Sequence, residues 1–159
     1  MSSADFYLKR GATNSWVTPL EVTRALGHFD TDPACADPQP WHHADVNYTE
    51  RDDGLAQPWR GRVWLNPPYA PALITRFSTK MVEHGNGIML VFPRTDTRWF
   101  QLLARSCDAM FLRAGRLQFC RQDGTVGGAF LGSVFFAFGK KNVRALARAK
   151  FPGVMFMRP

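Results

Sequence analysis

The amino-acid sequence predicts an α/β domain, in which helices alternate with the strands of one sheet. Short apolar runs such as 63–65 and 87–92 are separated by segments whose apolar residues recur every three or four positions. The run 87–92, Gly-Ile-Met-Leu-Val-Phe, is continuously apolar, which is typical of a strand buried on both faces. A chain of 159 residues with 45% hydrophobic residues suits one domain with one core, so we expect residues 1–159 to form a single domain.

The first predicted helix has recognisable signals at both ends. Thr18 is expected to be its N-cap, and Pro19 is expected at the first helical position. Glu21 would complete a Thr-x-x-Glu capping box with Thr18. Gly27 suits the C-terminal end, because glycine readily adopts the backbone conformation that stops a helix.

The later elements follow from apolar spacing and from breakers. Leu73, Phe77 and Met81 lie four residues apart and predict a helix over 72–84 with one apolar face. Gly85 and Pro93 then mark the ends of the elements before them. The other predicted elements are a strand at 29–32, a loop at 33–57, strands at 63–65 and 87–92, a helix at 97–105, strands at 109–112, 116–121 and 130–138, a flexible connection at 124–128, a basic helix at 142–150 and a last strand at 154–157.

Composition narrows the class of protein. The net charge of +7 and the sequence pI of about 9.8 favour a polyanionic partner. No apolar run approaches the roughly 20 residues that span a bilayer, and the N-terminus lacks a signal-peptide pattern, so we expect a cytoplasmic protein with no membrane partner. Cys35, Cys107 and Cys120 lack metal-ligand spacing, and the adjacent pair His42-His43 suits a solvated loop; no metal site is predicted.

The segment Asn66-Pro67-Pro68-Tyr69 is the most informative one in the chain. The two prolines stiffen the backbone at the exit of the strand predicted at 63–65 and keep its carbonyls out of a helix. Asn66 adds an amide oxygen that accepts hydrogen bonds, and Tyr69 adds a flat ring that can stack. Together these groups suit an exocyclic amine on a planar base, which is what methylation of such an amine requires.

The tetrapeptide resembles the catalytic motif of amino-methyltransferases that use S-adenosylmethionine. Five further segments agree with that resemblance in order and spacing. They are Trp16-Val17-Thr18-Pro19, Phe29-Asp30-Thr31-Asp32-Pro33-Ala34, Asp52-Asp53-Gly54-Leu55, Phe92-Pro93-Arg94-Thr95-Asp96-Thr97 and Gly115-Arg116-Leu117-Gln118-Phe119. From Trp16 to about Phe138 the chain resembles the small phage and prophage DNA N6-adenine methyltransferases, the Dam-like family. The resemblance implies a single-domain Rossmann-like methyltransferase fold, with a mixed sheet flanked by helices and no separate target-recognition domain.

The resemblance also implies the reaction and its residues. A methyl group would pass from S-adenosyl-L-methionine to the N6 amine of adenine in DNA, with the Asn66 amide oxygen and the Pro67 carbonyl accepting the amine hydrogens. Asp30 and Asp32 would contact the methionine ammonium or the ribose hydroxyls, and Asp53 the adenine of the cofactor. The implied catalytic residues are Asn66, Pro67, Pro68 and Tyr69, and the implied cofactor-binding residues are Trp16, Thr18, Pro19, Asp30, Asp32, Pro33, Ala34, Asp53 and Asn66. The chain departs from the wider methyltransferase pattern because no Gly-x-Gly loop follows its first strand.

Arginines in the second half of the chain are the predicted DNA contacts, since a guanidinium pairs well with phosphate or guanine. They are Arg94, Arg98, Arg113, Arg116 and Arg121. The cations of the predicted helix near the C-terminus, Lys140, Lys141, Arg144, Arg148 and Lys150, are instead expected to form a solvated face. We further expect a monomer or weak homodimer, encoded by a phage or prophage and acting in the cytoplasm of the bacterial host.

Three alternatives stay open from the sequence. The tetrapeptide also suits N4 of cytosine, because both bases carry an exocyclic amine. RNA or a protein glutamine amide is a different substrate class, although such enzymes usually carry a glycine-rich cofactor loop that this chain lacks. The last alternative is a DNA-binding protein on a degenerate methyltransferase fold, against which the intact residues 66–69 speak.

Overall fold

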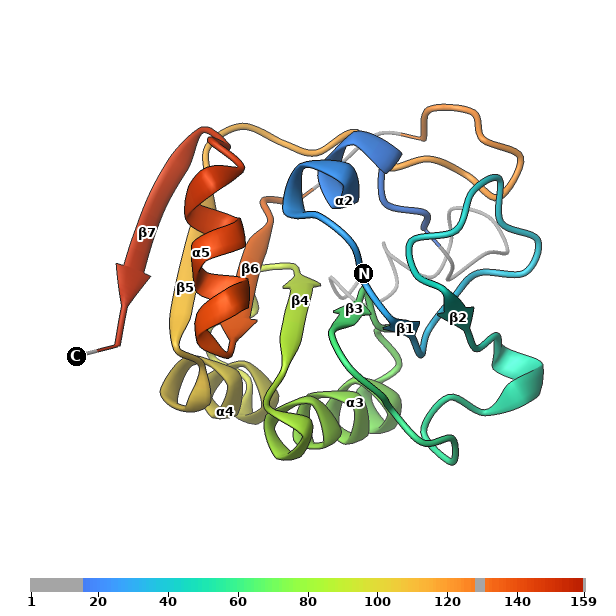
Figure 1. Cartoon of the computed structure of the whole chain (residues 1–159), viewed down its shortest axis with the longest axis horizontal. Helices are drawn as coiled ribbons and strands as arrows, with labels where there is room; N and C mark the ends of the chain where they lie inside the picture. The colour runs from blue at the N-terminus through green and yellow to red at the C-terminus, as the bar shows by residue number, and fades with distance from the viewer. Residues whose placement is uncertain (1–15, 128–130, 159) are drawn as a thin grey trace, which may run out of the picture.

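A computed structural model describes residues 16–127 and 131–158, which form one seven-stranded mixed sheet and four α-helices (Figure 1). The helices are α2 (Leu20–Leu26), α3 (Pro71–His84), α4 (Arg98–Ser106) and α5 (Lys140–Arg148), with a 3₁₀ turn, η1 (Glu50–Asp52). The strands are β1 (Thr31–Asp32), β2 (Val46–Asn47), β3 (Val63–Leu65), β4 (Gly87–Val91), β5 (Ala109–Arg113), β6 (Val134–Phe138) and β7 (Gly153–Met157).

The strand order in the sheet is β2-β1-β3-β4-β6-β5-β7. Strands β2, β1, β3 and β4 pair in parallel, whereas β6 is antiparallel to both of its neighbours, β4 and β5. Strand β5 therefore runs in the same direction as β4, and β7 pairs antiparallel with β5 at one edge of the sheet. As a result, the chain leaves β1, β3, β4 and β5 at the same edge, which is the edge where α/β sheets place their ligand sites.

Helices cover both faces of the sheet and give it three layers. Helices α3 and α4 contact each other, as do α2 and α5, and Figure 1 shows α5 lying across β5 and β6. Strand β3 is buried on both faces: Val63 and Leu65 pack in the core beneath α3 and α4, while Trp64 packs in the core beneath α2 and α5. This alternation follows from the two-residue period of a strand. In the part of the chain that the structure describes, no helix is long and apolar enough to cross a membrane.

Most elements are where the apolar pattern predicts them. The strand at 63–65 is confirmed with the same bounds, and the helix expected over 72–84 begins one residue earlier, at Pro71. The predicted strand at 87–92 ends at Val91, and Thr97 is the N-cap of α4 and accepts a hydrogen bond from the Phe100 amide at 3.4 Å. Cys35, Cys107 and Cys120 are buried free thiols, and burial raises the pKa of each.

The prediction for the start of the first helix is wrong. Pro19, not Thr18, is the N-cap of α2, and no side chain caps this helix. The Thr18 hydroxyl instead accepts a hydrogen bond from the Asn66 amide nitrogen at 3.3 Å, so it is not available to the helix amides. The expected capping box is therefore replaced by a contact with a residue 48 positions along the chain.

Three further expectations are corrected. Residues 116–121 do not form a strand; within them only Cys120 pairs, in isolated bridges to Val17 and Val126. The strand expected at 29–32 is reduced to Thr31–Asp32, because the backbone bends at Asp30. His43 is half-buried rather than solvated, with its Nδ1 2.8 Å from the Thr23 hydroxyl oxygen and its ring against Trp64.

Candidate active site

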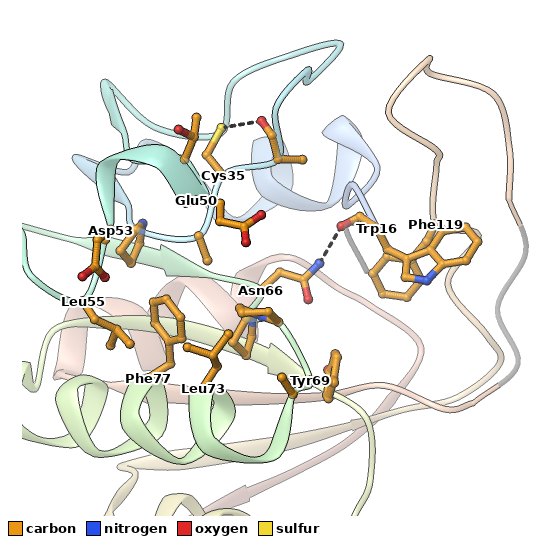
Figure 2. Close-up of a pocket in the computed structure, with 18 of the residues that line it drawn as sticks. Trp16, Cys35, Glu50, Asp53, Leu55, Asn66, Tyr69, Leu73, Phe77 and Phe119 are labelled. Atoms are coloured by element: carbon orange, nitrogen blue, oxygen red, sulfur yellow. Dashed lines mark hydrogen bonds between the residues drawn. The ribbon is translucent and has the colours of Figure 1, made fainter. Parts of the chain in front are cut away.

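A pocket of about 220 Å³ opens at the edge where the chain leaves β1, β3 and β4. Figure 2 shows that loops and helix α3, which carries Leu73 and Phe77, contribute to its lining. Its described lining residues are Trp16, Pro33, Ala34, Cys35, Ala36, Thr49, Glu50, Asp53, Gly54, Leu55, Asn66, Pro67, Pro68, Tyr69, Ala70, Leu73, Phe77, Phe92 and Phe119. The whole predicted tetrapeptide therefore faces one cavity.

Asn66 leaves β3 with its amide held in one orientation. Its Nδ2 donates to the Trp16 carbonyl at 3.1 Å and to the Thr18 hydroxyl oxygen at 3.3 Å, and Figure 2 shows the first of these bonds. A carbonyl oxygen only accepts, so the nitrogen of the amide must face Trp16. The Asn66 oxygen is consequently left to accept hydrogen bonds from a group in the pocket.

The extended segment 16–18 is itself held on both sides. Val17 exchanges two backbone hydrogen bonds with Cys120, each of 2.9 Å. The Trp41 indole donates to the Thr18 carbonyl at 2.9 Å. Two distant parts of the chain, at Trp41 and Cys120, therefore fix the segment whose acceptors orient Asn66.

Tyr69 forms an aromatic wall together with Phe92, which follows β4. The Tyr69 hydroxyl accepts the Phe92 backbone N–H at 2.9 Å, and the two rings stack with centroids 4.7 Å apart. Phe119 meets Phe92 edge-on at 6.0 Å. Burial raises the pKa of Tyr69, so its phenol is neutral at physiological pH. Since Phe92 covers one face of the Tyr69 ring, a base that enters the pocket either stacks on the other face or displaces Phe92.

The opposite wall is acidic and comes from a loop. Glu50 and Asp53 line the pocket, at the two ends of η1. Thr49 and Asp52 form a capping box on this turn, in which the Asp52 carboxylate accepts the Thr49 N–H at 2.8 Å. Asp53 has a φ of 49°, a left-handed conformation that aspartate tolerates better than most residues. The capped turn thus presents two carboxylates to the cavity.

Close contacts keep this loop against the rest of the pocket. A Cβ on Gly54 would lie 1.9 Å from the Pro33 carbonyl oxygen, so only glycine lets the two backbones approach so closely. On the other side, the Lys80 ammonium of α3 donates to the carbonyls of Leu55 and Gln57, both at 2.7 Å. Helix α3 and the loop after β1 together position the acidic wall.

Asp32 lies directly behind this wall. It is 3% exposed, and its Oδ1 accepts the Ala34 N–H at 3.1 Å. Burial raises its pKa to about 7, and the Ala34 bond only partly opposes that shift. Asp32 is not among the lining residues, but it directly precedes Pro33 and Ala34, which are.

Comparison with known proteins places the chain in a family. The family model described as DNA N-6-adenine-methyltransferase (Dam) matches residues 7–146, which is most of the chain. The protein belongs to this family. The similarity stated from the sequence motifs is thus confirmed.

The Dam-family relatives found include the DNA N-6-adenine-methyltransferase of Escherichia phage T1, which is 30% identical over 94 residues. This match covers 54% of the present chain and 38% of the phage protein, so the chain spans well under two thirds of that relative's length. No solved structure matches the chain.

The structure brings some of the predicted Dam-family site residues together and leaves others apart. Trp16, Pro33, Ala34, Asp53 and residues 66–69 line the pocket. Thr18 and Pro19 are buried beside it, where Thr18 contacts Asn66 rather than the cavity. Asp30 does not line the pocket; its carboxylate accepts the Arg62 N–H at 2.6 Å and lies 3.9 Å from the His28 ring.

The predicted DNA-contacting arginines lie partly around the pocket. Arg94 is exposed just after β4, and Arg113 ends β5 at the same edge, with its guanidinium 5.7 Å from the Phe151 ring centre. Arg98 is exposed at the start of α4. Arg116 and Arg121 are exposed in the connection between β5 and β6, where Arg121 donates to the Thr125 hydroxyl at 3.4 Å.

Sequence reasoning missed several residues of the pocket. Glu50 was not predicted, although it lies only three residues before Asp53. The spacing of Thr49 and Asp52 also suits a capping box, which would have indicated a turn at Glu50. Gly54, Leu55, Phe92 and Phe119 lie in motifs that support the family resemblance, but no role was predicted for them. The remaining unpredicted lining residues are Cys35, Ala36, Thr49, Ala70, Leu73 and Phe77; nothing local in the sequence marks them as pocket residues.

Replacing Asp32 by asparagine should remove a pH-dependent loss of stability. The native pKa of Asp32 is raised from 3.8 to about 7, so the folded protein binds more protons than the unfolded chain between these values. The contribution of Asp32 to the free energy of unfolding is highest below pH 3.8 and falls as the pH rises toward 7. We expect the free energy of unfolding, followed by urea denaturation, to drop by about 2–3 kcal/mol more between pH 5 and pH 8 in the unmutated protein than in Asp32→Asn.

The matched control is Asp123→Asn, which changes an exposed carboxyl whose pKa is lowered by the Thr125 hydroxyl and amide. Because this variant keeps Asp32, its free energy of unfolding should fall between pH 5 and pH 8 by as much as in the unmutated protein. Equal pH profiles for the unmutated protein and Asp32→Asn would contradict the assignment.

Gly54→Ala should destabilise the protein, because the new Cβ would overlap the Pro33 carbonyl. Forcing an extra carbon into a packed contact costs about 1–3 kcal/mol. Gly132→Ala is the matched control: its Cβ would be no closer than 3.9 Å to Pro93. Thermal unfolding should show a lower midpoint for Gly54→Ala than for Gly132→Ala, and equal midpoints would show that the loop yields without cost.

Proposed function

We propose that this protein transfers a methyl group from S-adenosyl-L-methionine to the N6 amine of adenine in DNA. The orientation of Asn66 carries the proposal. Because its amide nitrogen is engaged by Trp16 and Thr18, its oxygen is the atom that a substrate meets. An exocyclic amine is a donor, and an amide oxygen is its natural partner. Membership of the Dam family and the net charge of +7 agree with DNA as the substrate.

The polar and apolar groups that line the pocket suit those of S-adenosyl-L-methionine. That molecule carries an ammonium, two ribose hydroxyls and a flat adenine, and when bound it supplies an electrophilic methyl group. Glu50 and Asp53 offer carboxylates to the ammonium or the hydroxyls. Leu55, Leu73 and Phe77 offer apolar surface to a ring. Asp32 is placed behind Pro33 and Ala34 and is assigned a supporting role in holding that loop.

The residues at the end of β3 would act by accepting and positioning. The Asn66 oxygen and the Pro67 carbonyl would accept hydrogen bonds from the two N–H groups of the amine, which concentrates electron density on its nitrogen. As this nitrogen gained the methyl group, the S–CH₃ bond of the donor would break, and one N–H proton would then be lost to solvent. The prolines prevent this stretch from folding into α3, so the acceptors stay at the strand end. Positioning of reactants supplies up to about 7–11 kcal/mol in well-oriented reactions. The mechanism needs no nucleophilic side chain, in keeping with the three thiols being buried and of raised pKa.

The base must leave the duplex to reach this pocket, which costs a few kcal/mol. Tyr69 is assigned the stacking surface that offsets part of that cost. Its hydroxyl is anchored to the Phe92 amide, so the ring is held in place before the base arrives. Trp16 and Phe119 also line the pocket and add aromatic surface to it (Figure 2).

We assign the domain to the Rossmann-like methyltransferase fold. The support is the sheet order, in which strands β2, β1, β3 and β4 are parallel and the antiparallel β6 lies between β4 and β5. The site also lies where that fold places ligands, at the carboxyl ends of the parallel strands. In this assignment the loops around the pocket, rather than a separate domain, read the DNA.

Asn66→Ala should abolish methyl transfer while leaving the cofactor bound. The protein would be incubated with labelled S-adenosyl-L-methionine and unmethylated DNA, and the nucleosides separated by mass spectrometry. We expect N6-methyladenine from the unmutated protein and at least a hundredfold less from the variant, since losing one well-placed hydrogen-bonding group costs about 3–4 kcal/mol in the transition state. Calorimetry on the variant should still show cofactor binding.

Each other outcome changes the proposal in a defined way. N4-methylcytosine would keep the site and change the base. Methylation of RNA or protein alone would replace the substrate class. A variant with undiminished turnover would remove Asn66 from the mechanism, and no cofactor binding at all would favour a DNA-binding protein without enzymatic activity.

Tyr69→Ala should weaken binding of the extruded base more than binding of the cofactor. Stacking of a base on an aromatic side chain contributes about 1–3 kcal/mol, so the affinity for an oligonucleotide with 2-aminopurine at the target should fall by about 5- to 150-fold. Tyr69→Phe keeps the ring and loses only the acceptor for the Phe92 amide. If both variants weaken base binding equally, the hydroxyl contact and not stacking would be responsible.

A further inference from the structure

A second concave site lies at the far end of β3 from the pocket. It is a groove of about 300 Å³ between the end of α2 and one face of α5, two helices that contact each other in the structure (Figure 1). Its lining residues are Leu26, Gly27, His28, Arg62, Lys141, Arg144, Ala145 and Arg148. None of these described residues is acidic, and four are permanent cations.

Three of the cations follow the surface of α5. Lys141, Arg144 and Arg148 are spaced by three and four residues, which places them on one stripe of the helix. All three side chains are exposed, so their charges are available to a ligand. The stripe extends over about 10 Å of helix axis. A row of cations of this length can pair with several phosphates of a nucleic-acid backbone at once.

The fourth cation, Arg62, is buried at the base of the groove and is held in place. It is 4% exposed; its Nε donates to the Asn142 side chain and its Nη1 to the His28 carbonyl at 2.8 Å. The guanidinium also lies 4.2 Å from the centre of the Phe29 ring. Its Nη2 is buried and has no hydrogen-bond partner among the described residues. An unpaired buried donor on a charged group is costly, which indicates that an acceptor belongs there.

Nearby carboxylates do not cancel this charge. Asp30 accepts the Arg62 backbone N–H at 2.6 Å and lies 3.9 Å from the His28 ring. Asp45 lies 2.9 Å from the other nitrogen of that ring. Both carboxylates are outside the groove lining, and burial lowers the pKa of Arg62 while Asp30 opposes that effect. The groove therefore keeps an excess of positive charge.

We propose that this groove binds phosphates of the DNA backbone away from the target base. A DNA strand offers one charge for every 3.4 Å or so of helix axis, which matches a row of cations about 10 Å long. Arginine suits phosphate because its planar fork donates two parallel hydrogen bonds. The inference rests on the proposed function only in taking DNA as the partner.

The groove and the pocket lie at opposite ends of strand β3. Arg62 directly precedes β3 and Asn66 directly follows it, a separation of about 13 Å along the strand. Contacts in the groove would therefore add affinity and orientation without touching the base, as phosphate contacts generally do. The predicted arginines around the pocket and this groove would hold DNA at two places.

The test compares two triple variants with the same change in charge. Lys141→Gln/Arg144→Gln/Arg148→Gln removes the groove cations that are exposed. Lys140→Gln/Arg105→Gln/Arg158→Gln removes three exposed cations outside the groove, one of them from the same helix. Binding of a fluorescent 30-base-pair duplex would be followed by anisotropy over a series of salt concentrations, in the Asn66→Ala background and without cofactor, so that no methylation occurs.

Each phosphate contact contributes about 0.9 to the slope of log K against log salt. The groove variant should lose about 2–3 from that slope and at least tenfold in affinity near 100 mM salt, whereas the control variant should stay close to the parent. Equal slopes for both variants would overturn the groove, while methylation of DNA by the unmutated protein would still support the proposed function.

The possible outcomes distinguish a DNA site from a small-anion site, and they distinguish failure of the groove proposal from failure of the proposed function. Competition by millimolar inorganic phosphate alone, with no difference between the variants on DNA, would mean a small-anion site and overturn the DNA assignment. Absence of DNA binding by the parent would overturn the groove proposal and the DNA substrate together. Circular dichroism of the groove variant checks that α5 remains folded.

Discussion

The hydrogen bonds from Asn66 to Trp16 and Thr18 are the constraint on which the site depends. A primary amide can present either its oxygen or its nitrogen to a ligand, and the two ends differ little in shape. Only a fixed acceptor on one side decides between them. The segment 16–18 provides that acceptor, and it is itself fixed by Cys120 and Trp41. The chemistry proposed for β3 is thus determined by a short extended segment that precedes α2.

The two walls of the pocket are stabilised in different ways. Asn66 and Tyr69 follow directly from a strand buried on both faces, so the sheet itself limits their movement. The acidic wall follows only a two-residue strand and a single 3₁₀ turn, and it depends on individual contacts at Gly54 and Lys80. In the proposed function, this arrangement would keep the group that accepts from the substrate rigid and leave the cofactor side more adaptable. The loop after β1 adds one further contact to this side, in which the buried Asp32 carboxylate accepts the Ala34 N–H.

Sequence reasoning succeeded where the signal is local and failed where a partner is distant. The strand at 63–65 and the helix ending at His84 follow from apolar runs, spacing and a glycine stop. Thr18 reads as a cap because Thr-x-x-Glu is a local pattern, but the structure uses its hydroxyl for Asn66. The cations predicted to form a solvated face, from Lys140 to Lys150, are indeed exposed. The sequence near Lys141 does not show that Arg62, which donates to the Asn142 side chain, lines the same groove. The family could be predicted because its characteristic residues lie in short contiguous motifs.

Because β3 has only three residues, its two ends are held at a nearly fixed distance from each other. Only three residues separate Arg62 from Asn66, and each of the three is at most 1% exposed. Each end is also tied to a distant segment: Arg62 to Asn142 and Asn66 to Trp16. Neither end can shift by a residue without turning core side chains toward the opposite face. A phosphate bound in the proposed groove and a base amine bound at Asn66 would therefore be held at opposite ends of the same short strand. With the loops around the pocket proposed to read the DNA, β3 would be the rigid element through which backbone contacts help to position the base.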